Sequence, residues 1–246
     1  MPRFTSNALG VMGALLVSDA YEKIESSLDR FREAHFYIHE MERFYHQAEP
    51  FRWSLNSFLR ALKEIPQLFQ MELQREKGFP AWYRGHLQGL KDDPLVGYLG
   101  RSRDSVVHKG MLVPATSAFI GTTEGRGLKI GVKIPIHPLQ DSDAGMRSYI
   151  DVLRKRGDLL ELLRPDEEAL PCVERRWGLE QFEGEVVDVC AKAWLRVGEL
   201  VANVVEWLGE ERPSLALDCR HSSQRTRIKV YDRSVLRQWL LEGEST

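Results

Sequence analysis

Two long amphipathic stretches dominate the first third of the chain and constrain its fold more than any other feature. From Ser18 to Gln47, apolar residues recur at the three- and four-residue spacing of one helix face, and Phe51 to Lys77 repeats this pattern. Glu49-Pro50 between them predicts a turn, because proline disfavours helix in the residue before it. Pro66 is expected to kink or split the second helix. Helices of this length joined by a short turn pack antiparallel, which predicts a helical bundle.

Helical periodicity returns in four later segments. Shorter helices are predicted at Trp82 to Leu90 and from Pro94 to Gly110. Ser142 to Leu163 is also helical in pattern, and two prolines break the chain after it. A last long helix is expected from about Leu179 to Leu208, with mainly valines on its inner face.

Between these helices lies a segment rich in Val, Ile, Thr and Gly. Its glycine-rich centre, Gly121 to Gly127, is typical of a turn, and Ala118 to Ile120 and Leu128 to Ile136 flank it. This order predicts a β-hairpin. Pro135 and Pro138 indicate that the second strand lies at a sheet edge, because proline cannot donate to a strand ladder.

The tail from Leu215 to Leu241 alternates around Ile228 to Tyr231, which predicts one or two short strands. The expected fold is therefore mainly α: an antiparallel helical bundle with an inserted β-hairpin and a short β-containing C-terminal tail. We expect one bundle domain at 1–210, with the hairpin inserted at about 111–138, and a C-terminal extension at 211–246.

Charge and hydropathy limit the partners and the cellular compartment that we expect for this chain. With a formal net charge of −2, the chain lacks the overall basic character that attracts nucleic acid, so any basic surface is local. No apolar run approaches the roughly 20 residues of a membrane-spanning helix, so no membrane partner is expected. Asn7 to Val17 is apolar but follows only Arg3, which favours a buried packing segment over a secretory signal.

The three cysteines, Cys172, Cys190 and Cys219, are far apart and odd in number. They show neither a disulfide framework nor metal-ligand spacing, which fits a reducing cytoplasm. The sequence therefore predicts a cytoplasmic protein with no cofactor and no metal.

One short motif carries the chemistry: Arg103-Asp104-Ser-Val-Val-His108. Histidine titrates near neutral pH and can act as a general base or acid. Arginine stays charged and binds phosphate oxygens through two N–H groups. Arg101 is also spaced suitably from His108, so either arginine can fill the cationic role.

Here the chain resembles the HEPN superfamily, helical-bundle proteins whose ribonucleases carry Arg-x(4–6)-His with a polar residue often after the arginine. The resemblance covers roughly residues 18 to 110, and the helix expected at 179 to 208 is a further candidate for it. It implies a homodimer in which two copies of the motif line one cleft and cut RNA without a metal ion. Asp104, four residues before His108 on the same helix face, either orients the imidazole or is a solvated acid.

Two competing matches lie in the first long helix. Arg30 to His35 has the four-residue spacing and Arg32 to His39 the six-residue spacing. His35 falls on the apolar stripe of that helix, so we expect it to be buried and structural. The later motif is favoured by Asp104, by its place after two long helices, and by the apolar residues that would anchor it.

Two further groups are candidate RNA contacts. The start of the second helix carries Arg52, Trp53, Asn56 and Arg60, for which amphipathic packing is favoured over RNA binding. The basic stretch 220–229 fits either a nucleic-acid contact or an edge strand protected by charges.

The sequence therefore predicts a metal-independent endoribonuclease of HEPN type, with Arg103, His108, Asp104 and Arg101 as candidate catalytic residues. Within that superfamily such enzymes serve as toxins or antiviral-defence effectors, which implies RNA as substrate and a cognate antitoxin or regulatory protein. The alternative is a non-catalytic HEPN-like module that binds a protein or RNA partner.

Overall fold

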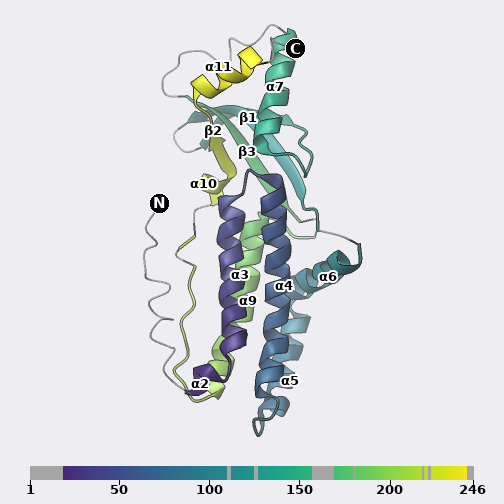
Figure 1. Ribbon diagram of the computed structural model, residues 1–246, viewed down its shortest axis with the longest axis vertical. Helices are drawn as coiled ribbons and strands as arrows, with labels where there is room; N and C mark the ends of the chain where they lie inside the picture. Colours follow the sequence, from purple (N-terminus) through teal and green to yellow (C-terminus); the bar gives the residue numbers. More distant parts are fainter. Residues whose placement is uncertain are drawn as a thin grey trace. The chain divides into compact units, whose positions relative to one another are not determined.

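The computed structural model describes residues 19–109, 112–124, 127–156, 169–179, 181–217, 219–220 and 223–242, so the apolar stretch at 7–17 lies outside it. The chain is mainly helical with one small antiparallel sheet, which confirms the predicted fold class at this level (Figure 1). It divides into two compact units. The helical unit comprises Met1–His39, Ser54–Leu112 and Val189–Arg220, and the sheet unit comprises Glu40–Trp53, Val113–Asp188 and His221–Thr246.

The helical unit is built from most of three long helices and from three shorter ones. The long helices are α3 (Glu25–Arg43), α4 (Ala48–Leu73) and α9 (Val186–Trp207), and the shorter ones are α2 (Asp19–Glu22), α5 (Phe79–Asp92) and α6 (Pro94–Lys109). Ion pairs link Lys23 to Glu76 and Arg30 to Glu64, both at 3.1 Å. The earlier residue, Lys23 just before α3, pairs with Glu76 just after α4, and the later residue, Arg30 in α3, pairs with Glu64 in α4. This reverse order shows that the two helices are antiparallel, as predicted.

Aromatic packing joins α3 to α9. The rings of Phe31 and Trp194 stack at 4.3 Å with an interplanar angle of 11°. The Trp194 indole N–H also donates a 3.0 Å hydrogen bond to the Phe31 carbonyl. Both side chains are buried, so this pair fixes the two helices against each other.

Proline and glycine shape the chain around α4. Pro66 does not split the helix, which runs unbroken from Ala48 to Leu73. The Pro66 carbonyl accepts a 2.8 Å hydrogen bond from the Tyr83 hydroxyl of α5. Gly78 then starts α5 with φ of 90°, a conformation that glycine adopts at little cost.

The sheet unit contains four antiparallel strands in the order β2-β1-β3-β4. The strands are β1 (Ala115–Glu124), β2 (Gly127–Ile134), β3 (Pro171–Gly178) and β4 (Ile228–Val230). The predicted hairpin is confirmed as β1 and β2, with Ala118 opposite Ile134 and an irregularity between Thr122 and Thr123. The second hairpin strand lies at a sheet edge, as its flanking prolines predict.

Strand β3 was not expected from the sequence. Six of its eight residues are buried, and Glu174 and Arg175 stand among them. A strand buried on both faces lacks the alternation by which strands are recognised. The last long helix begins at Val186 instead of near Leu179, because Leu179 pairs with Phe182 in an isolated β-bridge.

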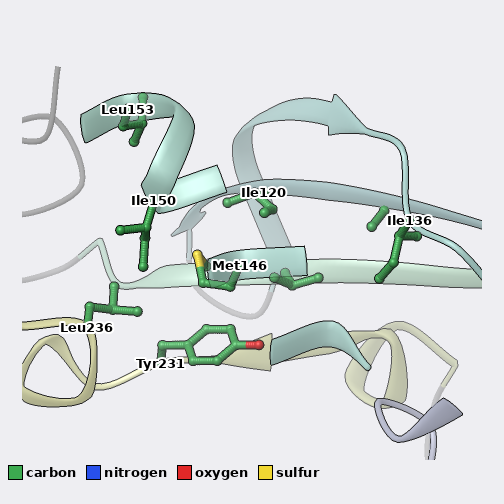
Figure 2. Close-up of a cluster of buried hydrophobic side chains, with 9 residues drawn as sticks. Ile120, Ile136, Met146, Ile150, Leu153, Tyr231 and Leu236 are labelled. Atoms are coloured by element: carbon green, nitrogen blue, oxygen red, sulfur yellow. The ribbon is translucent and has the colours of Figure 1, made fainter. Parts of the chain in front are cut away.

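Helix α7 (Ser142–Arg156) covers the core of the sheet unit, and α10 (Ser223–Arg227) and α11 (Arg233–Glu242) flank β4. Figure 2 shows Met146 and Ile150 of α7 beside the strands, with Tyr231 and Leu236 on the C-terminal segment. Residues 157–163, where the sequence also predicts helix, lie outside the described residues.

Candidate functional site

Helix α6 carries the predicted Arg-x4-His motif. Asp93 begins this helix, because its carboxylate accepts hydrogen bonds from the backbone N–H groups of Leu95 (2.9 Å) and Val96 (3.0 Å). Leu99 is buried and anchors the helix, and Ser102 is 9% exposed. The helix runs without interruption to Lys109, one residue beyond His108.

Arg103, Asp104 and His108 all lie within this helix, but their side chains are outside the described part of the chain. The backbone still fixes their relative positions. At 3.6 residues per turn, Arg103 and His108 are about 140° apart around the axis and about 7.5 Å apart along it. Asp104 lies one turn before His108 on the same face.

Arg101 is exposed and extends away from His108. A Cβ built on Gly97 would lie 3.3 Å from the Arg101 Nη1 atom. The guanidinium is therefore directed toward the N-terminal end of α6, whereas His108 is about 10 Å further toward the C-terminal end. This geometry favours Arg103 over Arg101 as the partner of His108 within one protomer.

The side chain of Asn56 on α4 is hydrogen-bonded to the backbone of the chain shortly after α6. Its side-chain oxygen accepts a 3.2 Å hydrogen bond from the Leu112 N–H, and its amide donates to the Leu112 carbonyl at 3.5 Å. Asn56 therefore holds the backbone at Leu112, three residues after the end of α6. The other candidate RNA contacts on α4 differ in exposure. Arg52 is buried, whereas Trp53 is 54% exposed and Arg60 is exposed.

The two competing histidines lie together on α3. His35 is half-buried instead of buried as the sequence predicts, because it lies at the margin of the α3–α9 contact, stacked on Trp194 at 4.9 Å. The His35 and His39 rings meet edge to face with centroids 4.7 Å apart. The exposed Cys219 lies beside both, with its Sγ 3.3 Å from each Nε2. The cysteine spacing along the sequence gave no sign of this cluster.

A hollow of about 210 Å³ lies between α5 and α9. Polar groups line it in pairs: Arg196 faces Asp93 at 3.7 Å, and Asn203 lies 3.3 Å from His86 Nδ1. Asp93 marks the start of α6, and His108 lies 15 residues further, about 22 Å along the helix. The hollow is therefore distinct from the predicted catalytic site.

The basic C-terminal stretch forms ion pairs where the structure describes it. Lys229 of β4 contacts Asp143 at 2.5 Å, and Arg227 lies 3.8 Å from Glu174. Asp143 also accepts a 2.8 Å hydrogen bond from the Tyr231 hydroxyl, and these partners hold its pKa below the usual value. Such pairing on an edge strand favours the structural interpretation of this stretch over RNA contact.

The sheet unit also buries an arginine. Arg175 donates to Thr116 Oγ1 at 3.2 Å and to the Gln140 carbonyl at 2.6 Å, and it lies 3.8 Å from the Trp177 ring. Burial lowers its pKa to about 10, so the guanidinium remains charged at neutral pH. These contacts join β1 and β3 to the loop before α7, which indicates a structural role.

Comparisons with known proteins give one match. A family model described as "Bacteriophage lambda protein ea47" matches residues 23–229. No curated protein and no solved structure matches the chain. Among the helices that the structure describes, none has the length and apolar character needed to cross a membrane.

Proposed function

Because the chain belongs to the family of bacteriophage lambda protein ea47, whose name carries no activity, we propose a function from its own residues. The helical unit is a HEPN-type bundle and acts as a metal-independent endoribonuclease, with Arg103 and His108 at its catalytic centre. One observation supports this proposal: α6 is continuous through the motif, and Asn56 of α4 holds the backbone at Leu112, three residues after that helix ends. His108 lies one residue before the end of α6, and the proposed phosphate binds there.

In the proposed reaction, His108 takes the proton from a ribose 2′-hydroxyl, and the 2′-oxygen attacks the adjacent phosphorus. The bond from phosphorus to the 5′-oxygen breaks, and that oxygen leaves with a proton from a second, protonated histidine. Arg103 binds the phosphate oxygens while negative charge develops on them. The products are a 2′,3′-cyclic phosphate and a free 5′-hydroxyl.

A homodimer supplies the second histidine. One protomer offers a single Arg103 and a single His108 on different sides of α6, so base, acid and phosphate clamp cannot all come from one copy. A two-fold axis beside the end of α6 brings two copies of the motif together. We assign Asp104 to orienting the imidazole.

An endoribonuclease that cuts cellular RNA damages its own cell unless it is restrained. The proposed biological role is therefore that of a toxin or antiviral-defence effector held in check by a cognate antitoxin or regulatory protein.

The test is cleavage of RNA by the purified chain in the presence of EDTA. His108→Ala and Arg103→Ala should each lower the cleavage rate by at least about 100-fold, because each removes a group that acts on the reacting phosphate. Lys109→Ala and Arg101→Ala on the same helix are the matched controls and should keep most of the activity. Circular dichroism should be the same for all four variants.

Four outcomes would contradict the proposal. Cleavage that needs Mg²⁺ would exclude the metal-independent mechanism. Loss of activity in Arg101→Ala but not in Arg103→Ala would move the cationic role to Arg101. Full activity in His108→Ala would exclude His108 as a catalytic residue. Tight RNA binding without any cleavage by the wild type would favour the non-catalytic binding module.

A further inference from the structure

The cluster of His35, His39 and Cys219 has no role in the proposed ribonuclease mechanism, although its chemistry is specific. We propose that these three side chains form a binding site for Zn²⁺ in the helical unit. Imidazole nitrogen and thiolate sulfur are the ligands that Zn²⁺ prefers in proteins. The set contains no carboxylate, so it is poorly suited to Mg²⁺ or Ca²⁺.

The distances fit a tetrahedral ion. With Zn–N near 2.0 Å and Zn–S near 2.3 Å, a nitrogen and a sulfur ligand should lie about 3.6 Å apart. Cys219 Sγ lies 3.3 Å from Nε2 of His35 and 3.3 Å from Nε2 of His39. All three ligand atoms lie within 4.8 Å of one another. Both nitrogen–sulfur distances are therefore within a few tenths of an ångström of those expected around one tetrahedral ion.

The helix and its neighbours hold two of the ligands in place. His35 and His39 are four residues apart on α3, which puts both imidazoles on one face of the helix. His35 is further held by stacking on Trp194, which is itself hydrogen-bonded to the Phe31 carbonyl. Little side-chain freedom remains to be lost at His35 when the ion binds.

The third ligand comes from the segment that follows α9. Cys219 is exposed, unlike the buried Cys172 and Cys190, so its thiol can lose its proton to solvent when a metal ion arrives. Binding would then fasten this segment to α3. Among the described residues three ligands converge, which leaves the fourth tetrahedral position for water or another donor.

Cobalt provides the direct test, because Co²⁺ takes the same ligands as Zn²⁺ and reports them by absorbance. The full chain, kept reduced and stripped of metal, should bind one equivalent of Co²⁺ with a thiolate-to-cobalt charge-transfer band and visible bands of tetrahedral geometry. Zn²⁺ should displace it. Cys219→Ser should lose the charge-transfer band, and Cys219→Ser and His39→Gln should each weaken Zn²⁺ binding by at least about 100-fold.

His137→Gln, which changes an exposed histidine of the sheet unit, is the matched control and should bind both ions like the wild type. Saturating Zn²⁺ should also raise the melting temperature of the wild type by about 5 °C or more, and leave that of Cys219→Ser unchanged. An unaltered cobalt spectrum in Cys219→Ser, or no saturable binding by the wild type at micromolar metal, would overturn the site. Because metal binding is measured without RNA, this result is independent of the ribonuclease assays.

Discussion

His46 in the sheet unit is held neutral by its surroundings. Its Nδ1 lies 2.8 Å from the Ser142 hydroxyl and its Nε2 lies 3.1 Å from the Thr226 carbonyl, so Nε2 carries the proton and Nδ1 accepts. Burial, and then the positive charge of Lys229, lower its pKa to about 4. Protonating this ring would require the Ser142 hydroxyl to change from donor to acceptor.

This shift makes stability depend on pH. An unfolded histidine has a pKa near 6.5. Between pH 6.5 and about 4, His46 therefore binds a proton in the unfolded chain but not in the folded chain. The contribution of His46 is therefore complete above pH 6.5 and is lost as pH falls toward 4, by on the order of 3 kcal/mol. Chemical denaturation at about pH 7 and about pH 5 should measure about 2 kcal/mol of this loss.

His46→Gln keeps a donor for Thr226 but cannot titrate. Its stability should fall less between the two pH values than that of the wild type, whatever its stability at neutral pH. His137→Gln serves as the control and should follow the wild type. An equal loss in His46→Gln and wild type would show that other groups cause the pH dependence.

At the level of elements, Gly198 sets how closely α9 approaches α3. A Cβ at this position would lie 2.5 Å from Leu215 Cδ1 and 3.2 Å from Phe31 Cζ. The end of the Leu215 side chain can shift, but Phe31 is fully buried and stacked on Trp194. A side chain at position 198 therefore crowds the packing between the two helices.

We expect Gly198→Ala to lower the free energy of unfolding by about 1–2 kcal/mol, although alanine favours helix by about 1 kcal/mol. Gly85→Ala on α5 is the matched control, because a Cβ there meets nothing within 4 Å. It should raise stability by up to about 1 kcal/mol. Urea denaturation measures both, and a stabilised Gly198→Ala would show that Phe31 and Leu215 can move aside.

For the whole molecule, the central question is whether catalysis needs two copies of the chain. A composite site predicts a dimer at micromolar concentration in analytical ultracentrifugation. It also predicts that His108→Ala inactivates a wild-type chain with which it pairs. A mixed dimer of wild type and His108→Ala retains only one of the two histidines that serve as base and acid.

After random exchange of equal amounts of wild type and His108→Ala, half of the dimers are mixed and one quarter keep both histidines. The cleavage rate should therefore fall to about one quarter of that of the same total amount of wild type. The same mixture before exchange, in which half of the dimers are wild type, provides the reference. A monomer that cleaves RNA, or a mixture that keeps about half of the rate after verified exchange, would refute the composite site.

The order of apolar and polar residues along the sequence by itself determined the long helices, α5 to α7 and the hairpin, but not α10 and α11, where the sequence predicted only short strands. These elements depend on local geometry: α6 begins at Pro94, and β1 and β2 flank the glycine-rich turn, as their residue patterns predict. The placement of Arg103 and His108 near one helix end follows from the same local rule. Their catalytic roles remain a prediction, because they depend on side chains beyond the described part and on a second copy.

Only the tertiary structure decided which distant residues meet. Strand β3 has no recognisable pattern, because neighbours on both faces and not its own alternation make it a strand. Cys219 lies 180 residues beyond His39, and no spacing rule connects them. They come together because Phe31 and Trp194 fix α9 against α3, and the chain after α9 returns along α3. Contacts of this kind depend on packing in three dimensions, which a one-dimensional pattern does not contain.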